Sequence, residues 1–152
     1  GEVVSDFIQE NENYFPELEN FATNIFNKIQ TNNRAGYSSI CEYLTNNHNI
    51  DVKDVVPDEN KPFTKQFYPV EKKFILSDYL SLETKKLFAA AQVAQLEASD
   101  IIDEYLKSFS FPTNLFMQSV LNKGMMLSLY KILLQLLLNK LRIGLPVCKT
   151  LK

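Results

Sequence analysis

The stretch that decides the fold runs from Thr113 to Ile143 and reads TNLFMQSVLNKGMMLSLYKILLQLLLNKLRI. Apolar side chains fall on nearly every side of this stretch at helical spacing, and it lacks the period-two alternation of a strand. Gly144 and Pro146 follow it, which is the usual order of signals at the end of a helix. The stretch therefore predicts a long, buried C-terminal helix whose one weak point is Gly124.

The polar side chains of this stretch fall on one line of the predicted helix. They recur every three or four residues and form a narrow stripe: Ser128, Lys131, Gln135, Asn139 and Arg142. One interpretation is the partly solvated edge of a core helix. The other is a candidate polar stripe that fixes the anionic head of an apolar ligand, such as the carboxylate of a fatty acid.

Positive charge accumulates toward the C-terminal end of the chain. The net charge is −2, yet no acidic residue follows Glu104, whereas seven basic residues do: Lys107, Lys123, Lys131, Lys140, Arg142, Lys149 and Lys152. Either the acidic N-terminal half packs beside this basic third, or the basic third faces an anionic membrane surface. The apolar run is shorter than the ~20 residues that span a bilayer, so a soluble core helix is favoured over a transmembrane helix.

The rest of the chain predicts further helices and a single domain over residues 1–152. Hydrophobic residues make up 45% and charged residues 22% of the chain, which is ordinary for a globular domain. Only four glycines are present, and the hairpin dipeptides Asn-Gly and Asp-Gly are absent, which disfavours a β-sandwich or barrel. Helical spacing predicts helices over 2–14, 16–30 and 35–46, a long one that starts near Ser77 or Ser81 and runs to 109, and a short one at 51–56. We expect an all-α bundle of about five helices around the apolar C-terminal helix.

The segment 57–75 is the longest connection without clean periodicity, and it holds three prolines. It interleaves basic and aromatic side chains, which we call the basic-aromatic loop: Lys61, Phe63, Lys65, Phe67, Tyr68, Lys72 and Lys73. Such a pattern can grip a nucleic-acid strand or a lipid surface. We favour aromatic side chains that pin the loop to the core and solvated lysines, because no nucleic-acid-binding motif is present and the pI is about 5.5. No nucleic-acid partner is expected.

The two cysteines leave the compartment undecided. Cys41 and Cys148 would form one disulfide in a secreted chain and two ordinary thiols in an intracellular one. The sequence does not separate these cases, so the localisation stays open.

The residue types of catalytic and metal sites are scarce. His48 is the one histidine, and neither a CxxC pair nor a glycine-rich phosphate loop is present. No nucleophile-elbow glycines surround a serine, and the acidic residues near 51–59 lack the ligand order of an EF-hand. We therefore predict no catalytic residues, no metal site, no cofactor and no enzymatic activity.

Three functional hypotheses fit these observations. The leading one is a non-catalytic helical binding protein that carries a hydrophobic or lipid-like molecule between its helices. The alternative is a protein–protein interaction module that uses an apolar helix face or the 57–75 loop. The third is a membrane-associating domain that acts through its acid-free C-terminal third.

Overall fold

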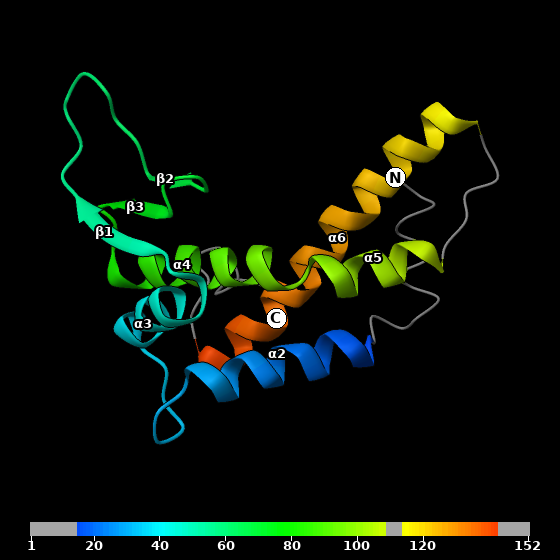
Figure 1. Cartoon of the computed structure of the whole chain (residues 1–152), viewed down its shortest axis with the longest axis horizontal. Helices are drawn as coiled ribbons and strands as arrows, with labels where there is room; N and C mark the ends of the chain where they lie inside the picture. The colour runs from blue at the N-terminus through cyan, green and yellow to red at the C-terminus, as the bar shows by residue number, and fades with distance from the viewer. Residues whose placement is uncertain (1–14, 109–113, 143–152) are drawn as a thin grey trace, which may run out of the picture.

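The computed structural model describes residues 15–108 and 114–142 of the 152-residue chain (Figure 1). The predicted helix over 2–14 and the residues Gly144, Pro146 and Cys148 lie outside this part. In the described residues the elements occur in this order: α2 (Pro16–Ile29), α3 (Tyr37–His48), β1 (Asp51–Val55), β2 (Lys65–Tyr68), β3 (Lys73–Ser77), α4 (Leu82–Glu97), α5 (Ser99–Lys107) and α6 (Leu115–Leu141).

A three-stranded mixed sheet overturns the predicted all-α fold. The strand order is β1-β3-β2, with β3 parallel to β1 and antiparallel to β2. The segment 51–56, for which a short helix was expected, contains strand β1 instead. The segment 57–75, expected to be irregular, contains β2 and the first three residues of β3. The protein is thus α/β.

The burial pattern of the central strand β3 explains why the sequence did not predict the sheet. Phe74 and Leu76 of β3 are fully buried while Ile75 between them is half-buried, so the alternation covers only a few residues. β1 and β2 are mostly exposed and carry little apolar signal. The prolines of the segment lie between the strands rather than in them, and Lys72 takes a left-handed conformation (φ 57°) in the turn before β3.

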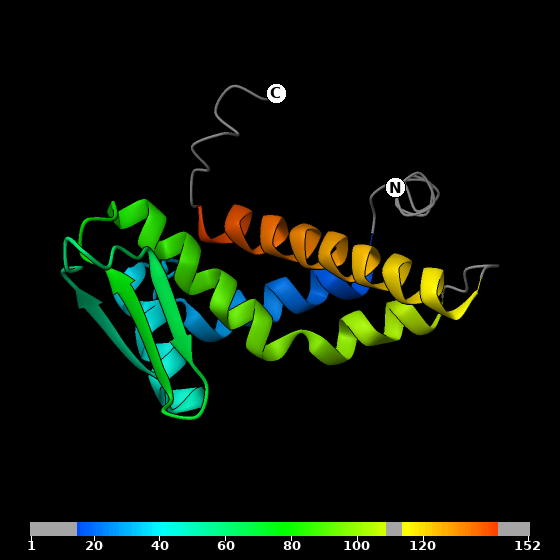
Figure 2. The same cartoon turned by 90° about the horizontal axis from the view of Figure 1, so that it is seen from above.

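The helices form the larger part of the described molecule (Figures 1 and 2). α6 packs against α2, α4 and α5, and it runs antiparallel to the α4–α5 pair. α3 packs against α4 and β1, which places the sheet at the α3 end of the molecule. Of the two predicted starts of the fourth helix, Ser77 belongs to β3, whereas Ser81 is the N-cap of α4. The predicted helix is also interrupted at the buried Ala98, where α4 ends and α5 begins. Ser99 and Asp100 follow, and both residue types favour helix starts.

The C-terminal helix supplies the largest share of the core. α6 is continuous through Gly124, and its inner face buries side chains along its length: Met125, Leu129, Leu133, Leu137, Leu138 and Leu141. The Asn114 side chain caps its first turn by accepting a hydrogen bond from the amide of Met117 at 2.8 Å. By length and composition alone α6 could cross a membrane, but the core helix of a soluble protein meets the same criteria.

Replacing Ser81 by alanine should reduce the free energy of unfolding by about 1 kcal/mol. The Ser81 hydroxyl accepts a hydrogen bond from the amide of Thr84 at 3.2 Å and so caps the first turn of α4. Urea denaturation measures the loss. The matched control is Ser99→Ala, because Ser99 is exposed and makes no capping hydrogen bond at the start of α5. Equal effects of the two substitutions would contradict the assigned role of Ser81.

Candidate functional site

The basic-aromatic loop lies on the arm formed by β1, β2, β3 and their connections. Its lysines are exposed, whereas Phe63 and Phe67 are half-buried. Phe67 packs edge-on against the buried Phe74, with ring centroids 6.2 Å apart, and Lys65 Nζ lies 5.1 Å from the ring centroid of Phe88. Phe67 thus packs within the sheet, Lys65 makes the contact with α4, and Tyr68 is exposed.

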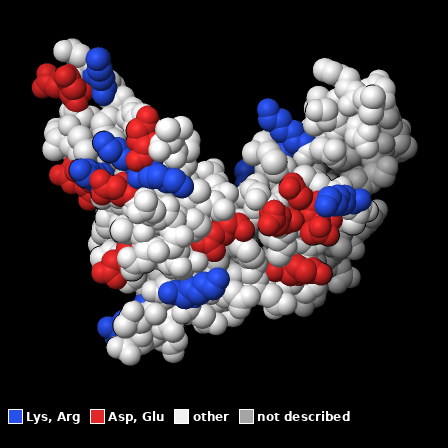
Figure 3. Space-filling model, in the orientation of Figure 1, with Lys and Arg blue, Asp and Glu red and all other residues white. Residues whose placement is uncertain are grey.

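The arm is not a strongly positive surface. Its lysines are accompanied by at least as many carboxylates: Asp51, Asp54, Asp58, Glu59, Glu71 and Asp78. Red and blue side chains are mixed over this part of the molecule in Figure 3. The attraction of a nearby polyanion to the lysines is therefore largely cancelled by repulsion from the acids.

The candidate polar stripe lies along α6 and is exposed except at Ser128, which is half-buried. The Gln135 side chain donates a hydrogen bond to Oδ1 of Asn139 at 2.9 Å, one turn along the helix. Because the stripe turns away from the core, its C-terminal members Asn139 and Arg142 reach a second surface, which the sequence did not indicate.

This second surface is a cationic pocket of about 290 Å³ between the α2–α3 connection and the C-terminal end of α6. Three elements and one turn contribute to its lining: Phe26, Asn33, Arg34, Ala35, Gly36, Lys86, Lys140, Leu141 and Arg142. A neighbouring hollow of about 330 Å³ shares Phe26, Asn33, Lys140 and Arg142 and adds Thr23 and Asn139. Neither lining contains an acidic side chain. We call Arg34, Lys86, Lys140 and Arg142 the cationic cluster.

The local backbone fixes both arginines of the cluster. Arg34 ends a tight turn in which Thr31 and Arg34 exchange backbone hydrogen bonds of 2.7 and 3.1 Å. Asn32 and Asn33 between them adopt left-handed conformations, which asparagine tolerates better than most residues. Arg142 is the left-handed C-cap of α6, with a φ of 58°.

Only part of the positive charge is neutralised within the chain. Lys140 lies 3.8 Å from a Glu19 oxygen, and Lys86 pairs with Glu83 of its own helix at 3.2 Å. Within residues 15–108 and 114–142, neither Arg34 nor Arg142 forms an ion pair. Cations at the end of α6 also interact favourably with the helix dipole, but Arg34 and Lys86 come from other elements. The cluster is an anion-attracting surface built from distant parts of the sequence.

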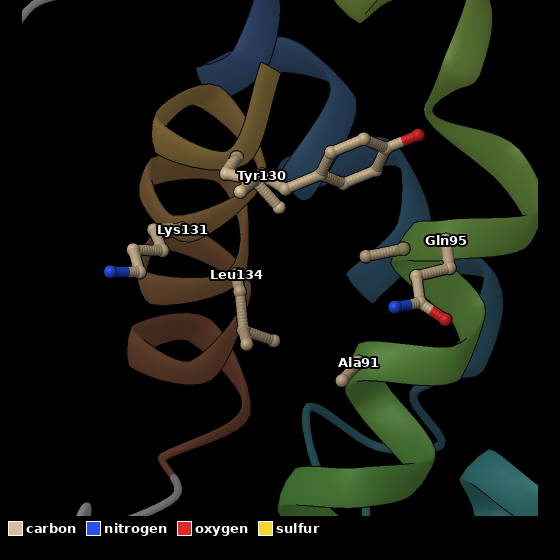
Figure 4. A pocket seen from close by; sticks show the side chains of 7 residues that line it. Ala91, Gln95, Tyr130, Lys131 and Leu134 are labelled. Carbon is tan, nitrogen blue, oxygen red and sulfur yellow. The ribbon is translucent and has the colours of Figure 1, made fainter. Parts of the chain in front are cut away.

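The apolar hollow between α4 and α6 is a poorer candidate (Figure 4). It has a volume of about 230 Å³ and is lined mainly by small and aliphatic side chains with Gln95, Tyr130 and Lys131. Figure 4 shows the Tyr130 ring directed toward α4, whereas the Lys131 ammonium points away from the space between the helices. Lys131 is therefore not placed to hold the head of a ligand in this hollow.

The remaining chemical groups serve the fold. Among the described residues, no group of three or more His, Cys, Asp or Glu side chains is placed to hold a metal ion. His48 Nε2 lies 2.7 Å from an oxygen of Glu97, which links the C-terminal ends of α3 and α4. Cys41 is a free, half-buried thiol whose pKa is raised chiefly by burial, and Cys148, its partner in the possible disulfide, lies outside the described residues.

The fold of this chain is similar to that of a solved protein. The structure is similar over 94% of this chain to a Mycobacterium tuberculosis transcriptional regulator, with a TM-score of 0.66 and 19% sequence identity. The chain spans 48% of the length of that regulator. No protein-family model and no curated protein sequence matches the chain. At this identity the likeness concerns the fold, and it agrees with an α/β rather than an all-α architecture.

This likeness overturns the functional expectations drawn from the sequence. A fold shared with a transcriptional regulator contradicts the carrier of a hydrophobic or lipid-like molecule, and with it the interaction-module and membrane alternatives. It also contradicts the expectation that nucleic acid is absent from the partners. The absence of enzymatic activity stays a prediction.

Proposed function

We propose that this chain is part of a DNA-binding transcriptional regulator and that its cationic cluster contacts the phosphate backbone of DNA. The observation that carries the proposal is the similarity of its fold, over nearly its whole length, to a transcriptional regulator. The cationic cluster supplies the chemistry, because phosphate contacts from lysine and arginine provide most of the non-specific affinity for DNA.

The exposed polar side chains along α6 support this assignment. Lys131, Asn139 and Arg142 lie on one exposed stripe of a helix that carries no acidic residue. Eleven residues separate Lys131 from Arg142, which corresponds to about 16 Å along a helix. Phosphates of one DNA strand follow one another at about 3.4 Å along the axis, so several of them fit beside this stripe. Such contacts orient a protein on the duplex without selecting a sequence.

The test is fluorescence anisotropy with a labelled DNA duplex of arbitrary sequence, recorded between 50 and 200 mM salt. We expect binding in the micromolar range, on the order of 10⁻⁶–10⁻⁴ M, that weakens steeply as the salt concentration rises. The double variant Arg34→Ala with Arg142→Ala should lower the slope of log K against log salt by about 2, one for each lost phosphate contact. Because the removed charges repel each other in the native state, the variant should fold normally.

The matched control removes the same charge from the arm, by Lys61→Ala with Lys72→Ala. We expect this variant to keep the salt slope of the wild type, since acidic neighbours already offset the arm lysines. If the arm variant loses binding and the cluster variant does not, the basic-aromatic loop is the contact and the proposed surface is wrong. No salt-dependent binding at 50 mM would contradict DNA contact by this chain altogether.

A further inference from the structure

We infer that the cationic pocket is a site for one phosphate group, held among Arg34, Lys86, Lys140 and Arg142 beside the start of α3. The inference deepens the proposed function and rests on it for the source of the phosphate, which there is the DNA backbone. A phosphorylated small molecule carries the same group, and the experiment below separates the two sources.

Positive charge is concentrated around one surface pocket. Four cationic side chains from the α2–α3 turn, α4 and the end of α6 line a pocket of about 290 Å³ whose lining has no carboxylate. Two of them, Arg34 and Arg142, have no ion-pair partner among the described residues. Guanidinium groups suit phosphate, because their planar N–H donors bind two oxygens at once.

The backbone at the wall of the pocket supplies further hydrogen-bond donors. Gly36, the N-cap of α3, lines the pocket and has no side chain that could cap the helix. The first amide bonded inside α3 is that of Ile40, which donates to the Gly36 carbonyl at 3.2 Å. The amides of Tyr37, Ser38 and Ser39 are therefore left without helical acceptors, as at every helix start. They add donors and partial positive charge on the side of the pocket where the cationic side chains converge.

The space beside Gly36 is open. A Cβ atom built on this residue would meet no heavy atom within 4 Å. The backbone there is extended, with a φ of −94° and a ψ of 179°, so any residue can adopt it. Because the space beside this residue is open, a side chain introduced at position 36 can be accommodated without displacing protein atoms, and from the N-cap position it can accept hydrogen bonds from the first amides of α3.

These features give a test that does not depend on loss of folding. Gly36→Asp adds a negative charge at the pocket wall and a carboxylate that competes for the first amides of α3, and it also supplies a favourable N-cap for this helix. We expect the variant to melt at or above the temperature of the wild type and yet to lose phosphate binding. The matched control Gly36→Ala adds a small, uncharged side chain at the same position. It should keep phosphate binding within about threefold while melting slightly lower, since alanine is a poorer N-cap than glycine.

The measurement is an amide NMR titration with inorganic phosphate at constant ionic strength, with sodium chloride as the reference salt. We expect saturable shifts of the Tyr37, Ser38 and Arg34 amides with phosphate but not with chloride, and their loss in Gly36→Asp. Shifts that are equal with the two salts, or that persist in Gly36→Asp, would overturn the inference.

A DNA arm separates this inference from the proposed function. If DNA uses the pocket, Gly36→Asp should weaken duplex binding about tenfold at 50 mM salt, and inorganic phosphate should displace DNA more strongly than chloride at equal ionic strength. Saturable phosphate binding without DNA binding would keep the pocket as a site for a phosphorylated small molecule and refute the proposed function. DNA binding that is insensitive to Gly36→Asp, together with no saturable phosphate binding, would refute the pocket alone.

Discussion

Leu133→Ala should destabilise the protein by about 3 kcal/mol, within the range of roughly 2–5 kcal/mol measured for leucine truncations in cores. Leu133 is fully buried on the inner face of α6, the helix that contacts α2, α4 and α5. Truncation removes apolar area from the centre of these contacts and leaves a cavity that three helices cannot easily close. For a chain of this size, thermal unfolding should shift down by about 6–12 °C.

The control for this substitution lies on the same helix. Leu127 is 54% exposed, so Leu127→Ala should change the free energy of unfolding by less than about 0.5 kcal/mol. Urea denaturation of both variants, with unchanged slopes, measures the difference directly. A loss below about 1 kcal/mol in Leu133→Ala would mean that α6 is not the centre of the core.

Lys85→Met should cost about 1–3 kcal/mol at pH 7, less than the roughly 3–5 kcal/mol of a fully buried pair that is broken. The Lys85 residue is largely buried, and its ammonium lies 3.1 Å from Asp54 and 3.2 Å from Asp78. Asp54 also accepts a hydrogen bond of 2.7 Å from the Tyr37 hydroxyl. Removing the ammonium leaves two carboxylates close together, but water reaches both of them, which limits the cost.

The pH dependence gives this prediction a second measurement. Burial acts to lower the pKa of Lys85, but hydrogen bonds from its ammonium to Asp54 and Asp78, and their charges, outweigh burial and raise the pKa above 10.5. A raised pKa means that the folded state holds the proton more tightly than the unfolded chain. The stabilisation is therefore complete below pH 10.5 and is lost as the pH rises through the folded-state pKa.

The difference in unfolding free energy between the wild type and Lys85→Met should thus shrink in alkaline solution. The neighbouring Lys86→Met is the control, because among the described residues Lys86 pairs with Glu83 one turn away and no other acid, and its loss should change stability by less than about 0.5 kcal/mol. A difference that stays constant from pH 7 to pH 11 would show that Lys85 acts by packing rather than by charge.

The helices with clear periodicity could be predicted from the sequence, and the sheet could not. The predicted ranges 16–30 and 35–46 correspond to α2 and α3, and the apolar C-terminal stretch is α6. These elements bury a repeating face against neighbours, so their pattern extends over several turns. The strands have four or five residues each and two of them are mostly exposed, which leaves too short a pattern to distinguish from a loop.

The cationic cluster was invisible to local pattern for a different reason. Arg34 and Lys86 are separated from Lys140 and Arg142 by more than fifty residues, and only tertiary packing brings them around one pocket. The predicted stripe on α6 includes Asn139 and Arg142, but it does not include Arg34 of the α2–α3 turn or Lys86 of α4. Basic and aromatic residues that are close in sequence indicated a binding surface on the arm instead, where acidic neighbours offset the positive charge. A site assembled from single residues on four segments leaves no motif.

The arrangement of the sheet also bears on how this protein can assemble. Because β3 lies in the middle, the two outer strands are β1 and β2, with five and four residues. Their exposed positions carry charge at Asp51, Lys53 and Lys65, and Pro57 follows β1 closely. Short, charged borders of this kind discourage a strand of another molecule from extending a sheet. The sheet of one copy is therefore a poor template for continuing the sheet of another.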